Sequence, residues 1–547
     1  MTPRTLTART LPTRTLPTRM AAAGLGCALV AALLSLTLHA PAWVRVAPML
    51  LVLVIMPGIA ISRHLGDGRQ KTPAAVPIAV GIAWLVLASE ALVYSHWWKP
   101  VALIPATVAV SGIALAVPTY RAAHRVRIGR LCLALAISFA GVLLAPSMWT
   151  MFRAPYTADE LRPLQAAWTW SQNTAGQTGR LPLSAMSFLE AAFIPFGHPS
   201  TGTLLATRWL GIGLLLASVA TASGWSRAFV HRRGAAATVA LLASTAGVAF
   251  VARLSDAAVV GAPLLLGAGW CLVGPTRSAR RLQLGGAMLG AAGLSSRQCA
   301  FAGLGLLLWM ALDDGQRRRA SPNHDDGVPL EQAALGILFA LVAGLLGAAA
   351  AGVSVPALAT DVSGWRAVPV RAHFHASFLA CVPLVFVVQV GLLREATSAV
   401  RRGRRVVVRR SYAPMLALAG SCIGAFLERA ALTRVVLLPL LLVVLCAANV
   451  LWPNEDADVA GVDGLRRGAD GSVRFVARRV GLTAVLIIAP LAAQIADVWG
   501  STNTEQVARV AYLLRQNAPS PAILDLTAAS LPPGWNDSRR TKRPSSS

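Results

Sequence analysis

The chain of 547 residues is 55% hydrophobic and only 13% charged, with a mean hydropathy of +0.59, and this composition excludes an ordinary soluble domain. Lysine and arginine exceed aspartate and glutamate by a net charge of +27, which in a soluble protein would indicate nucleic-acid binding. Here the basic residues fall in short clusters between apolar runs, as in the cytoplasmic loops of membrane proteins, so no nucleic-acid partner is expected. The cysteines lie in or beside apolar runs without metal-ligand or disulfide spacing, and we interpret them as small buried hydrophobic residues.

Long apolar runs predict an all-α polytopic membrane protein. A helix that crosses a bilayer needs about 20 mainly apolar residues, and only helices or closed barrels satisfy their backbone groups in lipid. The runs are too long for barrel strands, so we predict a bundle of about 13–15 transmembrane helices. The run 284–311 carries polar residues in its middle, Ser295 to Gln298, which predicts two short half-helices meeting at a polar tip. The predicted spans are 21–40, 46–62, 74–95, 101–118, 130–148, 203–222, 235–252, 257–274, 284–311, 332–354, 377–393, 411–427, 432–450 and 480–498.

The basic clusters predict which loops are cytoplasmic. We place the basic, low-complexity tail of residues 1–20 in the cytoplasm and let each span reverse the chain. The basic loops after 311 fall on the cytoplasmic side only if the run 284–311 crosses the membrane twice, which gives about fifteen crossings. Because Pro41 directly follows the candidate cleavage site at Ala40, the first span is interpreted as an uncleaved anchor in a bacterial inner (plasma) membrane. The basic loops that this topology places inside are 63–71, 121–130, 227–233, 277–281, 317–319, 394–410 and 466–479.

This topology divides the chain into a cytoplasmic tail, two sets of transmembrane helices and two outside regions. Helices of 21–148 precede a large periplasmic loop of 149–202, the main bundle covers 203–498, and a small periplasmic tail covers 499–547. The inside loop after 311 carries Asp313 and Asp314 beside a basic cluster and is interpreted as a solvated linker.

The loop of 149–202 is predicted to hold two amphipathic helices that lie in the membrane interface. The first begins at Asp159 and Glu160 and has an apolar face that includes Leu161, Leu164 and Trp168. The second, from 185 to 196, carries Glu190 on an otherwise apolar face.

Short motifs recur between 149 and 450, and all of them fall on the outside face of the predicted topology, which was derived from charge alone. They are Tyr156–Glu160, Phe196–Pro199 followed by Ala206–Leu210, Arg253–Asp256, Gly293–Arg297, Arg434–Leu440 and, more loosely, Arg180–Pro182. Together they resemble the polytopic GT-C glycosyltransferases, which take sugars from polyprenyl-phosphate carriers. The resemblance is to the protein mannosyltransferase and aminoarabinose transferase group, although five spans precede the acidic loop here where the best-known members have one.

The resemblance implies an inverting transfer of a sugar from a polyprenyl-phosphate donor to an envelope glycan, lipid or protein acceptor at the periplasmic face. A carboxylate takes the proton of the acceptor hydroxyl, and Asp159 is the candidate base, with Glu160 beside it. Glu190 is a further substrate-binding candidate, and Asp256 is expected to position the sugar or a divalent metal. The basic candidates for the donor phosphate are Arg180, Arg208, Arg297 and Arg434.

Simpler interpretations stay open for each candidate. Asp159 and Glu160 can cap the start of the amphipathic helix, and Asp256 can cap a helix after Ser255. Each arginine alone fits a side chain that extends to the membrane interface. His373 and His375 form a His-x-His pair without an evident third ligand, which favours a surface pair. The alternative functions are a secondary transporter, which should show paired interrupted helices, and a non-catalytic envelope-assembly protein.

Overall fold

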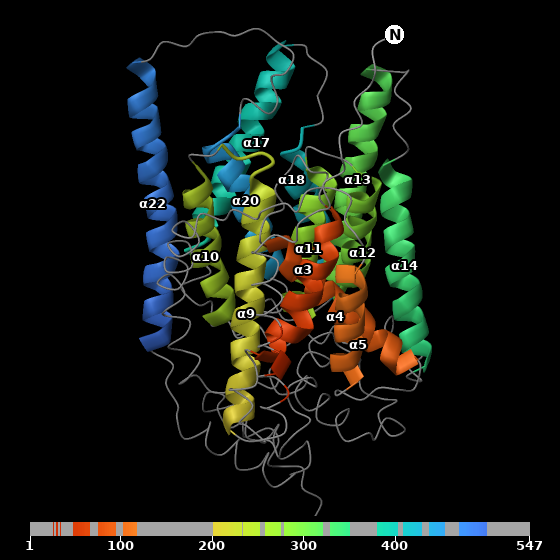
Figure 1. Ribbon diagram of the computed structural model, residues 1–547. Coiled ribbons are helices and arrows are strands. Elements are labelled where there is room, and N and C mark those ends of the chain that lie inside the picture. The colour runs from red at the N-terminus through yellow and green to blue at the C-terminus, as the bar shows by residue number, and fades with distance from the viewer. Residues whose placement is uncertain are drawn as a thin grey trace, which may run out of the picture.

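A computed structural model shows the fold of this chain (Figure 1). It describes residues 48–65, 75–94, 102–116, 201–231, 234–251, 257–274, 278–320, 329–350, 380–402, 409–428, 437–454 and 470–499, together with Gly26, Leu29, Val30 and Leu33. The predicted span 130–148, nearly all of the loop 149–202 and nearly all of the tail 499–547 lie outside these residues.

The described residues form a helical bundle, which confirms the all-α prediction. Their one β-contact is a bridge between Val230 and Pro453. The helices are η1 (Leu51–Ile55, a π-helical turn), α3 (Met56–Ser62), η2 (Arg63–Leu65), α4 (Ala75–Tyr94), α5 (Leu103–Ala116), α9 (Thr201–Ser226), α10 (Ala235–Val251), α11 (Ala257–Val273), α12 (Ala279–Ser295), α13 (Arg297–Ala320), α14 (Pro329–Ala350), α17 (Val382–Arg402), α18 (Tyr412–Glu428), α20 (Leu437–Leu451) and α22 (Asp470–Trp499).

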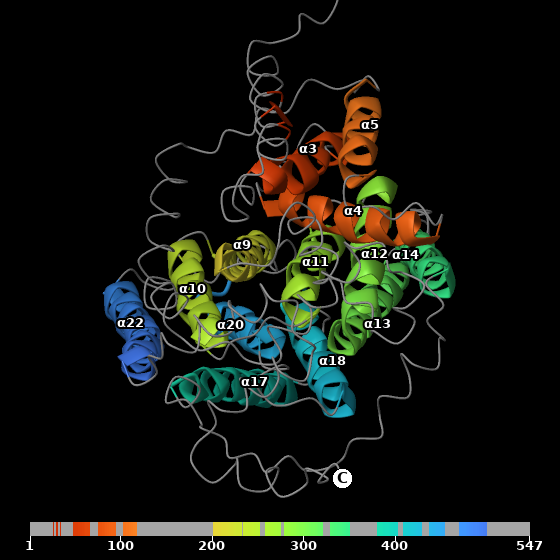
Figure 2. The same ribbon diagram turned by 90° about the horizontal axis from the view of Figure 1, so that it is seen from below.

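Helix α11 lies at the centre of the bundle and packs against α9, α12, α13 and α20 (Figure 2). Its side chains from Leu264 to Leu266 are fully buried, as are most of those of α20. Helix α22 lies at the edge beside α10 in both views (Figures 1 and 2). The inner helices are therefore apolar on every side, as the continuous apolar runs of the sequence require.

Glycines allow two helix pairs to pack at backbone distance. A Cβ atom at Gly286 of α12 would overlap the carbonyl oxygen of Ala333 in α14. A Cβ atom at Gly420 of α18 would likewise overlap the carbonyl oxygen of Phe301 in α13. In a membrane, where the hydrophobic effect does not drive helices together, helices commonly associate through small residues that let their backbones approach closely. The α12–α13 pair is thus held tightly on both sides.

The turn after α9 meets the end of α20. The backbone N–H of His231 donates to the carbonyl of Trp452 at 2.9 Å. Gly391, near the middle of α17, packs against Val450 in the last turn of α20. The carboxyl ends of α9 and α20, and the part of α17 beside Gly391, therefore lie at one end of the bundle.

Neighbouring helices bring further basic segments to that end. Trp225 lies against Gly269, so α9 and α11 end together. Arg281, at the start of α12, donates to a carbonyl in the last turn of α11 at 2.6 Å. The indole of Trp309 in α13 donates to the carbonyl of Arg409, just before α18, at 2.9 Å. We call this the basic end, and its basic residues include Arg227, Arg280, Arg281, Arg319, Arg394, Arg409 and Arg410.

The amino-terminal helices pack differently from the rest. Helices α3 and α4 are antiparallel and close, because a Cβ atom at Gly58 would overlap the carbonyl oxygen of Pro77. Helix α4 then runs across the other helices and contacts α9, α11, α12 and α14 (Figure 2). The sequence predicts that 74–95 is a membrane-spanning helix. It does not predict that this helix runs across the other helices of the bundle.

The predicted break at Ser295 to Gln298 is confirmed, and the predicted half-helices are wrong. Ser296 separates α12 from α13, but these helices have 17 and 24 residues and extend well beyond 284–311. They are antiparallel, because Gly303 of α13 packs against Leu289 of α12. The solvated linker is also corrected: Asp313 and Asp314 belong to α13, and Asp313 is only 8% exposed.

The helices differ from the predicted spans chiefly at their ends. Helix α17 continues through Arg394 to Arg402, and α22 begins at Asp470, so both include basic residues that were assigned to loops. By length and hydropathy, only Thr207–Ser226 among the described residues qualifies as a membrane span, with 20 residues and a mean hydropathy of 1.3. The other apolar helices in this part of the chain have 10–17 residues.

Candidate functional site

The structure describes two of the predicted site residues, Arg208 and Arg297. The candidates that lie outside the described residues are Asp159, Glu160, Arg180, Glu190, Asp256 and Arg434, together with His373 and His375.

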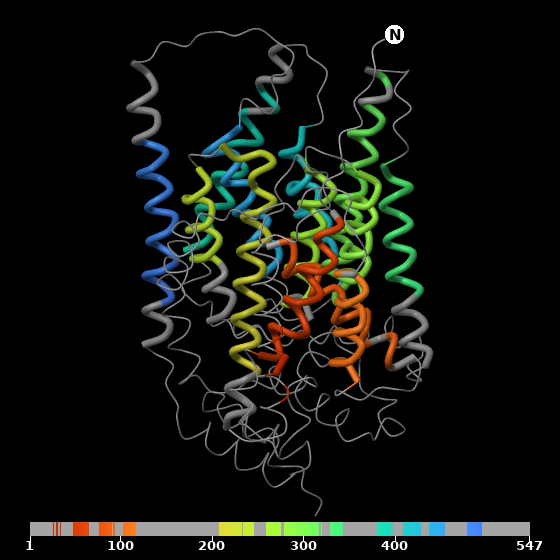
Figure 3. Tube along the Cα trace, viewed as in Figure 1, coloured from red at the N-terminus to blue at the C-terminus, as the bar shows by residue number. Residues whose placement is uncertain are grey.

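A single serine separates α12 from α13, two helices in the green part of the trace (Figure 3). Ser296 has an extended backbone, with φ −161° and ψ 140°. Its N–H donates to the carbonyl of Ala292 at 3.2 Å, and its own carbonyl accepts the N–H of Ala300 at 3.0 Å. Its side-chain oxygen accepts the N–H of Cys299 at 3.5 Å. Ser296 therefore ends one helix and is the N-cap of the next, a position for which serine is strongly preferred.

Arg297 is the first residue of α13. A cation at a helix amino terminus meets the positive end of the helix dipole, which disfavours it by about 0.3–1 kcal/mol at an exposed site. Helix stability therefore gives no reason for an arginine here. The guanidinium and the positive end of the helix dipole together favour an anion. Arg297 is half-buried, and the adjacent Gln298 is fully buried.

The turn is held in place by α18. A Cβ atom at Gly424 would lie 2.7 Å from Cα of Gln298 and 3.1 Å from the carbonyl oxygen of Arg297. The backbone of Arg297 therefore lies directly against α18, and only glycine at position 424 permits this approach. The backbone position of Arg297 is thus set by the packing of two helices rather than by a loop.

Arg208 lies in the amino-terminal half of α9. Its side chain is only 6% exposed, so it is buried within the protein. This burial does not fit the interpretation that Arg208 extends to the membrane interface. A buried charge inside an apolar helical bundle is costly and is usually retained for a function.

Arg208 and Arg297 lie toward the same end of the bundle, opposite the basic end. Helices α9 and α11 end together near Trp225, and α11 and α13 are both antiparallel to α12. Helices α9, α11 and α13 are therefore parallel, and their amino termini point away from the basic end. Helix α11 lies between α9 and α13 (Figure 2). The two arginines thus come from helices on either side of α11 that present their positive dipole ends to one face.

Buried polar side chains elsewhere were not predicted. Arg281 is 3% exposed, donates to the carbonyl of Trp270, and has its guanidinium carbon 3.9 Å from the centre of the Trp270 ring. Gln494 of α22 is fully buried, and its side-chain amide donates to the carbonyl of Ser244 at 2.5 Å. Arg281 lies at the basic end, so it does not belong to the candidate site. In the sequence, the only sign that Gln494 would be buried and bonded was its position as a single glutamine in an apolar run.

Within the part of the chain that the structure describes, no three His, Cys, Asp or Glu side chains are grouped so that they could bind a metal ion. The expected metal-positioning residue, Asp256, lies outside this part. Comparison of the chain with protein-family models, curated proteins and solved structures finds no match.

Proposed function

We propose that this chain is an integral membrane glycosyltransferase with a GT-C-like helical bundle. It transfers a sugar from a polyprenyl-phosphate donor to an envelope glycan, lipid or protein acceptor at the periplasmic face of a bacterial inner membrane. The proposal joins the sequence resemblance to one structural observation. Arg208 and Arg297 lie on parallel helices toward the end of the bundle that is opposite the basic end.

The outward side chains support the membrane placement. Large apolar residues recur at helical spacing on the outer faces of the peripheral helices, where a soluble protein would carry polar groups. On α13, Leu304 and Leu308 are 58% and 52% exposed. Lipid is the solvent for which such faces are suited. Equivalent exposed residues are Leu335, Leu338 and Phe339 on α14, Phe386, Val390 and Leu393 on α17, Phe426 on α18 and Val485 and Ile488 on α22.

The buried hydroxyl groups also suit a low-dielectric interior. Ser218, Thr221 and Thr238 each donate to the carbonyl four residues earlier in their own helix, at 2.8–2.9 Å. Serine and threonine in transmembrane helices commonly satisfy their hydroxyl groups in this way. The gathering of basic residues at one end is what the predicted cytoplasmic loops require.

The proposed reaction needs a base for the acceptor hydroxyl and positive groups for the donor phosphate. As the acceptor hydroxyl attacks the anomeric carbon, Asp159 takes its proton, and the bond from that carbon to the phosphate oxygen breaks. The phosphate of the carrier leaves with the electron pair of that bond. Guanidinium groups stabilise this developing charge, and the amino ends of α9 and α13 add to their effect.

A kinetic comparison of arginine variants tests the donor site. Full-length protein is reconstituted in vesicles with a polyprenyl-phosphate sugar, and transfer is measured over a range of donor concentrations. Arg208→Gln and Arg297→Gln are expected to raise the KM for the donor by about tenfold or more, since charge-assisted bonds to phosphate are lost. The control is Arg319→Gln, at the exposed carboxyl end of the same α13. Equal KM values for all three variants would remove both arginines from the site.

A second comparison tests the base. Asp159→Asn keeps the capping ability of the residue but cannot accept a proton, so transfer should fall by about 10²- to 10⁴-fold. Glu160→Gln should cost less, because adjacent helical side chains point about 100° apart. Normal transfer by the Asn variant would indicate a capping role. Donor binding without any transfer by the unmodified chain would instead favour the transporter or assembly alternatives.

A further inference from the structure

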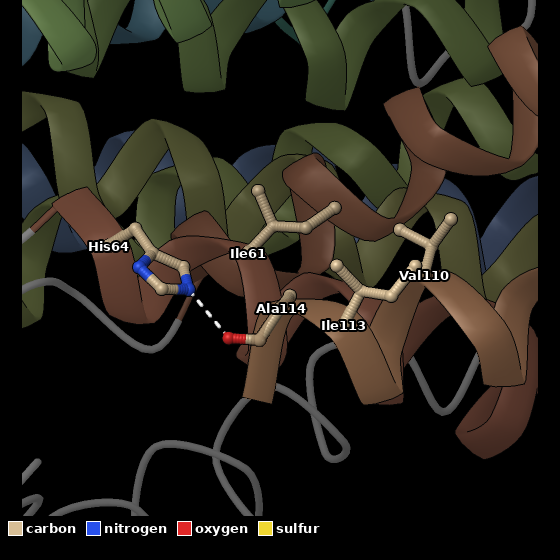
Figure 4. A pocket seen from close by; sticks show the side chains of 5 residues that line it. All are labelled: Ile61, His64, Val110, Ile113 and Ala114. Atoms are coloured by element: carbon tan, nitrogen blue, oxygen red, sulfur yellow. Dashed lines mark hydrogen bonds between the residues drawn. The ribbon is translucent and has the colours of Figure 1, made fainter. Parts of the chain in front are cut away.

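A groove of about 380 Å³ lies between the end of α3 and the end of α5, and its lining is apolar along most of its length (Figure 4). Ile61 forms one wall, and Val110, Ile113 and Ala114 form the other. Ile113 is 65% exposed, so its side chain faces the surroundings. The groove belongs to neither the predicted sugar-transfer residues nor the helices that carry Arg208 and Arg297.

One end of this groove is polar. The ring nitrogen Nε2 of His64 lies 2.7 Å from the carbonyl oxygen of Ala114. Because a carbonyl can only accept, Nε2 carries the proton and donates it. The carbonyl belongs to the last turn of α5, where no intrahelical partner remains, so His64 acts as a side-chain cap. Figure 4 shows His64 at one end of the lining residues and Val110 at the other.

An exposed cation lies beside this hydrogen bond. Arg63, the residue before His64 in η2, is exposed. A described positive charge therefore lies next to the polar end of the groove.

We infer that this groove binds one anionic phospholipid of the cytoplasmic leaflet, with its phosphate at the His64 end and an acyl chain along Ile61, Ile113 and Val110. The order of the lining residues matches the order of groups in such a lipid. Basic residues next to a membrane surface attract anionic headgroups, each with a contribution equivalent to about fivefold in affinity. A zwitterionic lipid fills the apolar part equally well but does not gain from the charges. The inference rests on the membrane placement and not on sugar transfer.

Native mass spectrometry of the delipidated full-length protein tests this inference. The protein in detergent is titrated with dioleoyl phosphatidylglycerol or dioleoyl phosphatidylcholine, and the affinity for the first bound lipid is measured. We expect phosphatidylglycerol to bind more tightly by about fivefold, because the exposed Arg63 favours an anionic headgroup. Arg63→Gln should reduce this preference by about fivefold. Ile113→Trp should fill the groove and abolish the tight first binding of phosphatidylglycerol.

The control for the bulky variant is Leu338→Trp, which enlarges an outward side chain of similar exposure on α14. It should bind phosphatidylglycerol like the unmodified protein. Equal affinities for the two lipids, or unchanged binding by Ile113→Trp, would overturn the lipid site while leaving the glycosyltransferase proposal intact. A protein that binds neither lipid would overturn the membrane placement as well.

Discussion

Replacing Gly420 by alanine should destabilise the bundle, although alanine favours helices more than glycine does. The new Cβ atom would overlap the carbonyl oxygen of Phe301, which belongs to the backbone of α13 and cannot rotate away. Overpacking of this kind costs about 1–3 kcal/mol, and a backbone obstacle places the cost in the upper half of that range. The helix propensity of alanine offsets up to about 1 kcal/mol. A net loss of about 1–2 kcal/mol follows.

The matched control is Gly213→Ala in α9, where a Cβ atom would have no neighbour within 4 Å. This variant keeps the propensity gain without the overlap, so its free energy of unfolding should be unchanged or higher by up to about 1 kcal/mol. Denaturant titration of both variants in the same detergent measures the difference, which should be about 1–3 kcal/mol. If Gly420→Ala is as stable as Gly213→Ala, then α13 and α18 do not pack at backbone distance.

Three other substitutions test particular contacts of the bundle. Ser296→Ala should lower the free energy of unfolding by about 0.5–1 kcal/mol through loss of the α13 cap, whereas Ser295→Ala should change it little, because the Ser295 hydroxyl bonds a carbonyl within α12. Gln494→Leu should cost about 1 kcal/mol and raise hydrogen exchange in α22 rather than throughout the chain, because this amide ties α22 to α10. Arg281→Lys should lower the midpoint temperature of thermal unfolding, because the guanidinium that stacks on Trp270 and donates to its carbonyl is lost. The control, Arg280→Lys, changes an exposed residue and should leave this temperature unchanged. Equal midpoint temperatures for the two variants would show that Arg281 contributes only its charge.

The helices could be predicted closely because apolar length and charge are local signals. For 235–252 and 257–274 the predicted spans differ from α10 and α11 by one residue at the carboxyl end. The polar residues at 295–298 likewise predicted the place of the break. Basic helix ends were predicted less well, because arginine has a high helix propensity and a helix does not stop where the membrane stops. Helix α17 therefore continues past its predicted end at 393.

Long-range packing could not be predicted from these local signals. The transverse course of α4 depends on contacts with several helices that follow it in the chain, and its sequence resembles that of any spanning helix. The lengths of α12 and α13 were underestimated because both half-helices were confined to the apolar run 284–311, whereas the two helices extend into the polar residues on either side of it. The groove beside His64 depends on one bond to Ala114, fifty positions away in sequence. For the site itself, the sequence nominated Arg208 and Arg297, and the structure adds that the first is buried and the second begins a helix.

The length of α12 gives the position of Arg297 a consequence for the donor site. Between Arg281 at the basic end and Ser296 at the turn, α12 rises at most about 22 Å, at about 1.5 Å per residue. The hydrocarbon core of a bilayer is about 30 Å thick. If Arg281 lies at the cytoplasmic edge of that core, the turn lies several ångströms short of the opposite edge. An arginine there is shielded from bulk water yet long enough to reach the headgroup layer. That layer is where the phosphate of a lipid-linked sugar resides, so the proposed function expects a recessed Arg297 to meet the donor phosphate from within the bundle.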